Sequence, residues 1–138
     1  EKFTKLIDEL QLNNNCLLHH TVSNIAEKYC MSSIFVLSSR YEGLPLVLGE
    51  AMAYGIAPVA FACPCGPRDM ITNGKNGLLV ENGNIEQLAK QICYLIENEN
   101  IRIEMGRQAK IRAKDFTMEV ISRQWKSLFE ELMEYAPQ

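Results

Sequence analysis

Hydrophobic and polar positions along the chain follow two different spacings, and together these predict alternating strands and helices. Short continuous apolar runs are typical of buried strands and occur at residues 16–18, 34–37, 57–61 and 78–80. Apolar side chains that recur every three or four positions predict helices over residues 2–12, 22–29, 44–54, 84–97, 100–114 and from 117 onward. Gly66 and Pro67 open a further short helix. The alternation favours an α/β fold in which a parallel sheet carries helices on both faces.

The last predicted helix has one continuous apolar face. It begins near Thr117, a residue type that caps helices well. Its apolar side chains are Ile121, Trp125, Leu128, Phe129 and Leu132. Because their spacing has the period of core packing, we expect Trp125 to belong to the core rather than to form a platform for a ligand.

Composition and charge narrow the classes of function. The 138 residues fit a single domain, and the net charge of −3 comes without the basic stripe that nucleic-acid binding requires. No apolar run approaches the roughly 18 residues of a membrane span, and no secretory signal is present. The five cysteines are irregularly spaced, and Cys63 and Cys65 lack a second pair. We therefore expect a cytoplasmic domain with reduced thiols and no metal site.

The candidate chemistry lies between the strand at 34–37 and the helix that follows it. Glu42 falls in the connecting loop and Glu50 falls inside the helix, with seven residues between them. In an open α/β sheet, ligands bind beyond the carboxyl ends of the strands, where such loops lie. The start of a helix presents unpaired N–H groups and partial positive charge, and this arrangement binds phosphate. Gly43 permits a tight turn, and Pro45 suits the first helical position.

Spacing alone leaves a structural interpretation of both glutamates open. Glu42 near a helix start is also a favourable partner for the helix dipole, worth roughly 0.3–1 kcal/mol. Glu50 can equally be an ordinary exposed helix residue.

The order of these residues resembles a known family. Residues 38–45 read Ser-Ser-Arg-Tyr-Glu-Gly-Leu-Pro, residues 50–59 read Glu-Ala-Met-Ala-Tyr-Gly-Ile-Ala-Pro-Val, and the similarity continues through 65–71 and 73–80. This pattern resembles the family 4 glycosyltransferases, retaining enzymes of the GT-B fold that use nucleotide-sugar donors and carry two glutamates separated by seven residues. The resemblance covers nearly the whole chain. It implies a Rossmann-like domain corresponding to the C-terminal, donor-binding half of a GT-B enzyme.

The resemblance also implies roles for individual residues. Glu42 takes the role of the glutamate that contacts the donor sugar, and Glu50 takes the role of the one that holds the ribose. The donor diphosphate would be bound by backbone amides, which match Gly43, Leu44 and Leu46. The resemblance implies neither a metal ion nor a cofactor beyond the nucleotide-diphosphate sugar itself.

Three positions leave alternatives open. Pro45 stands where many relatives have a second glycine, and its missing N–H excludes it as an amide ligand. His20 stands where many relatives have glycine in the loop that meets the nucleotide base, so it contacts the nucleotide or is merely structural or exposed. Arg68 reaches a donor phosphate or an acidic sugar, or pairs on the surface with Asp69 or Glu81.

We therefore expect residues 1–138 to form a single, N-terminally truncated donor-binding domain of a retaining hexosyltransferase. The chain opens at Glu1 rather than at a methionine, and no basic strand-loop segment for the diphosphate precedes it. We expect it to be inactive alone and to need an N-terminal acceptor domain of the same protein. Without that domain, part of the apolar face of the last predicted helix of this chain would be exposed and would promote self-association. The resemblance suggests polysaccharide biosynthesis with a glycan or lipid-linked acceptor, with room for peripheral membrane association of the whole enzyme.

Two other functions are alternatives to this one. A non-catalytic module that holds nucleotide sugars or docks a partner enzyme is compatible with the departures at Pro45 and His20. A dinucleotide-dependent oxidoreductase lacks support, because no Gly-x-Gly-x-x-Gly follows a strand.

Overall fold

A parallel sheet of three strands forms the centre of the molecule. The structure, a computed structural model, describes residues 2–135. The strands β1 (Ile34–Leu37), β2 (Ala57–Phe61) and β3 (Leu78–Val80) lie side by side in that order. Ile34 lies opposite Ala57, and Val59 lies opposite Leu78. All five residues of the central strand β2 are buried, as expected for a strand covered on both faces.

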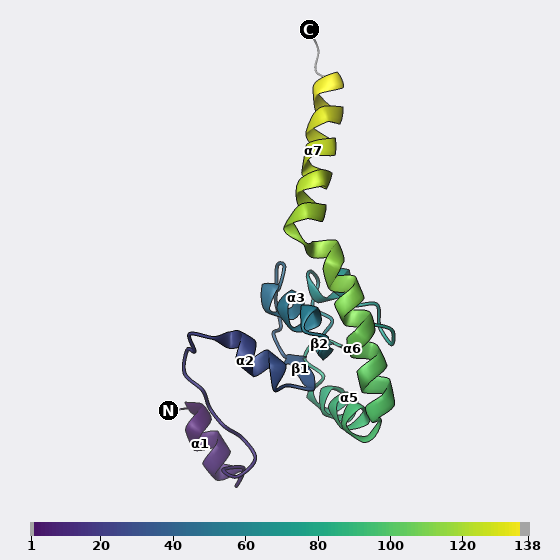
Figure 1. Cartoon of the computed structure of the whole chain (residues 1–138). Coiled ribbons are helices and arrows are strands. Elements are labelled where there is room, and N and C mark those ends of the chain that lie inside the picture. The colour runs from purple at the N-terminus through teal and green to yellow at the C-terminus, as the bar shows by residue number, and fades with distance from the viewer. Residues whose placement is uncertain (1, 136–138) are drawn as a thin grey trace.

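Helices cover the sheet from both sides, which confirms the predicted fold class (Figure 1). On one face, Val59 and Phe61 pack in a cluster with Leu88 and Leu95 of α5 (Ile85–Glu97). On the other face, Ala60 packs with side chains of α3 (Leu46–Ala53). Successive strand residues point to opposite faces, so β2 joins both clusters.

The long helix α6 (Glu99–Ala113) lies against both α3 and β2. Its closest approach is at Gly106, where an added Cβ would overlap the carbonyl oxygen of Gly55. Gly55 ends the turn after α3 with φ of +79°, a conformation that favours glycine. The two glycines together allow the backbones of α6 and the α3–β2 turn to touch.

Short elements complete this body of the molecule. They are α2 (Ile25–Cys30), α4 (Pro67–Met70) and the 3₁₀ turn η1 (Lys114–Phe116). Asn84 caps α5 by accepting a hydrogen bond of 3.0 Å from the backbone N–H of Gln87. Arg68 donates its Nε–H to the carbonyl oxygen of Ala62 at 2.9 Å and makes no ion pair within the described range 2–135.

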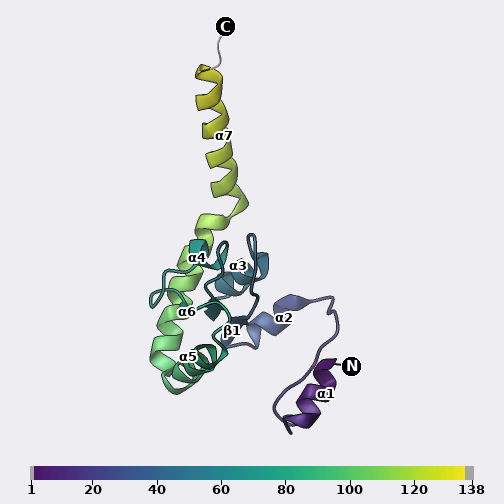
Figure 2. The ribbon, with the colours of Figure 1, turned by 180° about the vertical axis from the view of Figure 1, so that it is seen from behind.

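The predicted strand at residues 16–18 is wrong. These residues have no regular structure, and Leu17 is 79% exposed. A strand needs a neighbour to satisfy its N–H and C=O groups, and β1 is paired only with β2. The segment instead joins α1 (Lys2–Glu9), which ends earlier than predicted, to α2 (Figure 2).

The predicted core position of Trp125 is also wrong. Helix α7 (Met118–Glu134) projects from the end of α6 away from the sheet, and none of its residues is buried (Figures 1 and 2). Trp125 is 55% exposed and, among the described residues, its one aromatic neighbour is Phe129 of its own helix, at 5.6 Å between ring centroids. The predicted apolar spacing is present in α7, but within residues 2–135 no other element buries its apolar face.

Candidate functional site

The loops that follow β1 and β2 meet at the carboxyl ends of these strands. The first spans residues 38–45 and contains Glu42 and Gly43, and the second runs from residue 62 to Gly66. Gly66 has φ of +77°, and a Cβ there would overlap the carbonyl oxygen of Gly43 and lie 2.5 Å from Cδ of Pro45. A residue without a side chain at position 66 is therefore required for the loops to pack this closely.

Helix α3 starts directly after the first loop and leaves donors free. Pro45 is the N-cap, one position before the predicted one, because the helix begins at Leu46. Its carbonyl oxygen accepts hydrogen bonds from the N–H groups of Leu48 (3.0 Å) and Gly49 (3.4 Å). Within residues 2–135, the N–H groups of Leu46 and Val47 have no hydrogen-bond partner. Free N–H groups at a helix start are the kind of donors that can bind an anion, and they match the arrangement that the sequence predicts.

Glu50 lies on the exposed side of α3, between two hollows. It lines a cavity of about 940 Å³ together with His20 and Tyr29, and a smaller one of about 330 Å³ together with Leu44 and Leu46. Its Oε2 accepts a hydrogen bond of 2.9 Å from the hydroxyl of Tyr29. The structure thus brings three other predicted site residues, His20, Leu44 and Leu46, to the two hollows that Glu50 borders.

Glu42 and Gly43 lie apart from these hollows. Glu42 is half-buried in the first loop, and its side chain makes no hydrogen bond or ion pair with any described residue. Neither residue lines the two cavities that Glu50 borders. Among the described residues, no cavity or hydrogen bond joins Glu42 to Glu50.

His20 borders the large cavity from the irregular segment before α2. Its neighbour His19 places Nε2 3.4 Å from Nζ of Lys28, and both residues line the same cavity. Imidazole rings and a lysine ammonium group therefore line the hollow that Glu50 borders. They can hydrogen-bond to a ligand there.

Tyr29 is a site residue that sequence reasoning missed. In the pattern it counted only as an apolar position of a short helix, yet its hydroxyl lies at the edge of the large cavity. Burial, followed by the hydrogen bond to Glu50, raises the pKa of Tyr29 to about 12. A tyrosine at an apolar helix position could have indicated this contact, because a buried tyrosine hydroxyl needs a hydrogen-bond partner.

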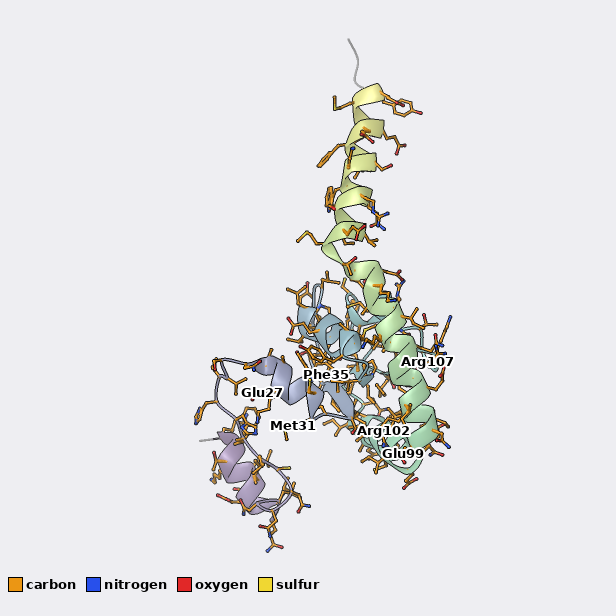
Figure 3. All side chains as sticks on the ribbon, in the orientation of Figure 1. Glu27, Met31, Phe35, Glu99, Arg102 and Arg107 are labelled. Atoms are coloured by element: carbon orange, nitrogen blue, oxygen red, sulfur yellow. The ribbon has the colours of Figure 1, made fainter. Side chains whose placement is uncertain are left out.

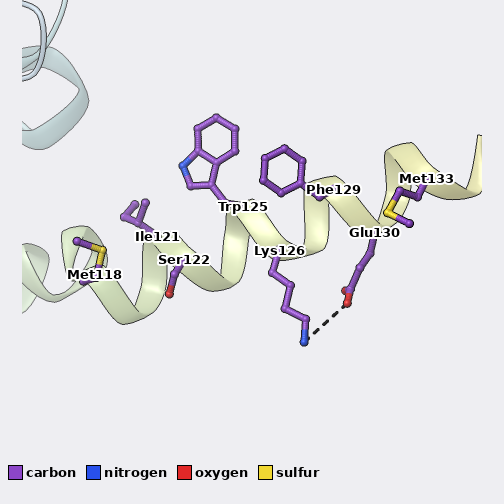
Figure 4. A pocket seen from close by; sticks show the side chains of 8 residues that line it. All are labelled: Met118, Ile121, Ser122, Trp125, Lys126, Phe129, Glu130 and Met133. Carbon is purple, nitrogen blue, oxygen red and sulfur yellow. Dashed lines mark ion pairs between the residues drawn. The ribbon is translucent and has the colours of Figure 1, made fainter. Parts of the chain in front are cut away.

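A third hollow, of about 530 Å³, lies along α7 and is separate from this site (Figure 4). Trp125 and Phe129 form its apolar wall, and the pair Lys126–Glu130 borders it at 3.7 Å. Over the described part of the chain, no cluster of three His, Cys, Asp or Glu side chains is placed to hold a metal ion. None of the described helices is both long and apolar enough to cross a membrane.

The sequence matches a family described as glycosyl transferases group 1 over residues 1–112. It is 33% identical over 128 residues to an uncharacterized glycosyltransferase of Haemophilus influenzae, covering 93% of this chain and 36% of that protein. It is 32% identical over 130 residues to the poly(ribitol-phosphate) α-N-acetylglucosaminyltransferase of Staphylococcus aureus, covering 94% of this chain and 26% of that protein. The chain thus spans about a third or less of the length of these relatives.

A solved structure shares the fold. A variant of the Staphylococcus aureus protein TarM, solved with fondaparinux, α-GlcNAc-glycerol and UDP, superimposes with a TM-score of 0.86 at 32% identity. The superposition covers 93% of this chain and 26% of that one.

Proposed function

The chain belongs to the group 1 glycosyl transferases, and we propose that it forms the donor-binding part of a retaining hexosyltransferase. The observation that carries the proposal is the start of α3, where two free N–H groups lie beside Glu50 and its cavity. A relative of the same fold was solved with UDP, which supports a nucleotide-diphosphate sugar as donor. The transferred hexose would go to a glycan or a lipid-linked acceptor in polysaccharide biosynthesis, since one relative is by its name a poly(ribitol-phosphate) α-N-acetylglucosaminyltransferase.

In this proposal the start of α3 holds the donor diphosphate. The amides of Gly43, Leu44 and Leu46 lie on or next to the exposed loop, and the partial positive charge of the helix start favours the leaving phosphate as its negative charge develops. Pro45 cannot contribute an N–H, so the diphosphate would rely on the amides to either side. No metal ion is required for this arrangement.

Each acidic residue has a separate task. Glu50 faces the cavity of about 940 Å³ and would accept hydrogen bonds from the ribose, with His20 close to the base on the same wall. Glu42, without a hydrogen-bond partner among the described residues, would orient the donor sugar. The transition state carries positive charge on the sugar, which a carboxylate stabilises.

The rest of the protein would supply the acceptor site. The curated relatives are about three times as long or longer, so a further domain of the same protein would bind the acceptor. That domain would also cover the apolar face of α7, whose side chains would otherwise promote self-association. We place the reaction in the cytoplasm because all five cysteines are free, as is usual where thiols stay reduced.

Sugar transfer by the complete protein tests this proposal. We expect turnover with a uridine or guanosine diphosphate sugar, and retention of the anomeric configuration in the product by NMR. Glu42→Ala should lower kcat by about 100-fold or more with donor binding kept, and Glu50→Ala should weaken donor binding. The control is Glu86→Ala, which removes an exposed glutamate from the first turn of α5.

A second outcome would support the non-catalytic alternative. Donor binding without turnover in the complete protein would indicate a module that holds nucleotide sugars. An inverted product would contradict the retaining mechanism and leave the donor site intact.

A further inference from the structure

Tyr29 is held rigidly at the edge of the large cavity. It is the only buried residue of α2 and is 7% exposed. Its ring lies 5.3 Å from the ring of Tyr54 and 6.5 Å from that of Phe35, and it packs with Ala51 and Ile56. A ring confined on several sides keeps one rotamer, so the position of its hydroxyl is fixed.

The hydroxyl of Tyr29 joins α2 to the second turn of α3. It donates to Oε2 of Glu50 at 2.9 Å and lies 3.5 Å from the carbonyl oxygen of Val47. The raised pKa of Tyr29, caused first by burial and then by Glu50, keeps the phenol protonated at neutral pH. Tyr29 is therefore a hydrogen-bond donor to this carboxylate under all ordinary conditions.

The other oxygen of Glu50 has no recorded partner among the described residues. A carboxylate offers about four acceptor sites on its two oxygens, so the bond to Tyr29 leaves most of them open. Without that bond, an exposed glutamate samples several rotamers and loses that freedom when a ligand binds. A fixed donor from a buried ring removes part of this loss.

We propose that Tyr29 is a positioning residue, which fixes the carboxylate of Glu50 so that its free oxygen accepts hydrogen bonds from the ribose of the donor. The proposal rests on the donor site proposed above. It assigns a task to a side chain on α2, an element that carries no part of the two-glutamate motif. The alternative is that Tyr29 only fills space between α2 and α3.

Binding of UDP to the complete protein, measured by calorimetry with GDP as a second probe, separates these two roles. Tyr29→Phe keeps the ring and removes only the hydroxyl. We expect the Kd of the preferred diphosphate to rise about three- to tenfold, the effect of one net hydrogen bond. The matched control is Tyr54→Phe, which removes a hydroxyl from the ring stacked on Tyr29 without touching Glu50, and its Kd should stay within about twofold.

A double variant tests whether Tyr29 acts through Glu50. If it does, adding Tyr29→Phe to Glu50→Gln weakens binding no further than Glu50→Gln alone. The preference for UDP over 2′-deoxy-UDP should also shrink in Tyr29→Phe, a readout that a packing role would not move. Independently of any ligand, Glu50→Gln should lower the pKa of Tyr29, followed by the absorbance of tyrosinate.

The outcomes distinguish this inference from the proposed function. If neither diphosphate binds the wild-type protein, the donor site is wrong and the positioning role falls with it. If diphosphate binds and Glu50→Gln weakens it while Tyr29→Phe matches the wild type, only the positioning role is overturned. Additive losses in the double variant would also overturn it.

Discussion

Helices α5 and α7 have similar apolar faces and different surroundings. Both carry large apolar side chains at three- and four-residue spacing. In α5, Leu88 and Leu95 are buried against β2 and β3, whereas no residue of α7 is buried. Figure 3 shows the same contrast, with the side chains of α7 standing free and those around α5 crowded against the sheet.

The difference shows what periodicity predicts and what it does not. Spacing identifies the face of an element that is apolar, but burial depends on a neighbour that lies far away in the sequence. In α5 that neighbour is the sheet of the same chain. In α7 no described element supplies it, so its apolar face is left for another part of the protein, as proposed above.

The largest expected effect comes from the packed helix. Leu95 is 0% exposed, so Leu95→Ala should lower the free energy of unfolding of the chain by about 2–5 kcal/mol through lost burial and a residual cavity. Leu128→Ala in α7 is the matched control, because the same deletion falls on an exposed side chain and should change stability by less than about 0.5 kcal/mol. Urea unfolding measures both. Equal losses would show that α7 is packed in solution.

A smaller effect is expected where α6 touches the α3–β2 turn. Gly106→Ala should lower the free energy of unfolding by about 1–3 kcal/mol, because its Cβ would overlap the carbonyl oxygen of Gly55. Helix propensity alone predicts the opposite, a gain of up to about 1 kcal/mol. Thermal unfolding decides the sign, and Gly43→Ala, whose Cβ would meet nothing within 4 Å, is the control. A stabilised Gly106→Ala variant would contradict the close contact.

Polar substitution on α7 should leave the stability of the 138-residue chain nearly unchanged. Trp125→Ser removes an aromatic side chain that is 55% exposed, and we expect a change below about 0.5 kcal/mol. Trp125 is the sole tryptophan of the chain. Its fluorescence should be strongly quenched by iodide, and a quenching rate like that of a core tryptophan would show that the apolar face is covered.

The smallest effect concerns an ion pair on the outer face of α6. Glu104 is exposed and accepts hydrogen bonds from Arg107 at 2.7 and 2.8 Å, which lower its pKa to about 2. A lowered pKa contributes stability above the ordinary value of 4.5, and this contribution is lost as the pH falls towards 2. Glu104→Gln should therefore be slightly less stable than the parent at neutral pH.

The gap between Glu104→Gln and the parent should close as the pH falls, and unfolding curves over that range follow it. Solvent screening keeps the effect small. The control is Glu86→Gln, because Glu86 makes no ion pair among residues 2–135. A gap that persists at low pH would show that the substitution acts through something other than charge.

The sequence predicts the sheet and most of the helices because their patterns are local. Strands β1, β2 and β3 were predicted with their observed bounds, since each is a short apolar run between turn residues. Residues 16–18 have an equally apolar run without a neighbouring strand, and Trp125 has the right spacing without a covering surface. Both errors concern partners, which a local pattern does not contain.

The candidate site was predicted in part for the same reason. The loop, the free N–H groups and Glu50 follow from a continuous stretch of chain after β1. Tyr29 lies 21 residues before Glu50, and only the folded chain brings its hydroxyl to that carboxylate. His20 reaches the same cavity, whereas Glu42 stays apart from it.

Gly66 shows how a position without chemistry of its own can control a site. The missing side chain lets the loop after β2 approach the backbone of Gly43, so the two loops pack directly against each other. Any larger residue there would clash with the carbonyl oxygen of Gly43 and would shift the loop that carries Glu42. In the donor site proposed above, a substitution at position 66 would therefore change the space for the sugar without replacing either glutamate.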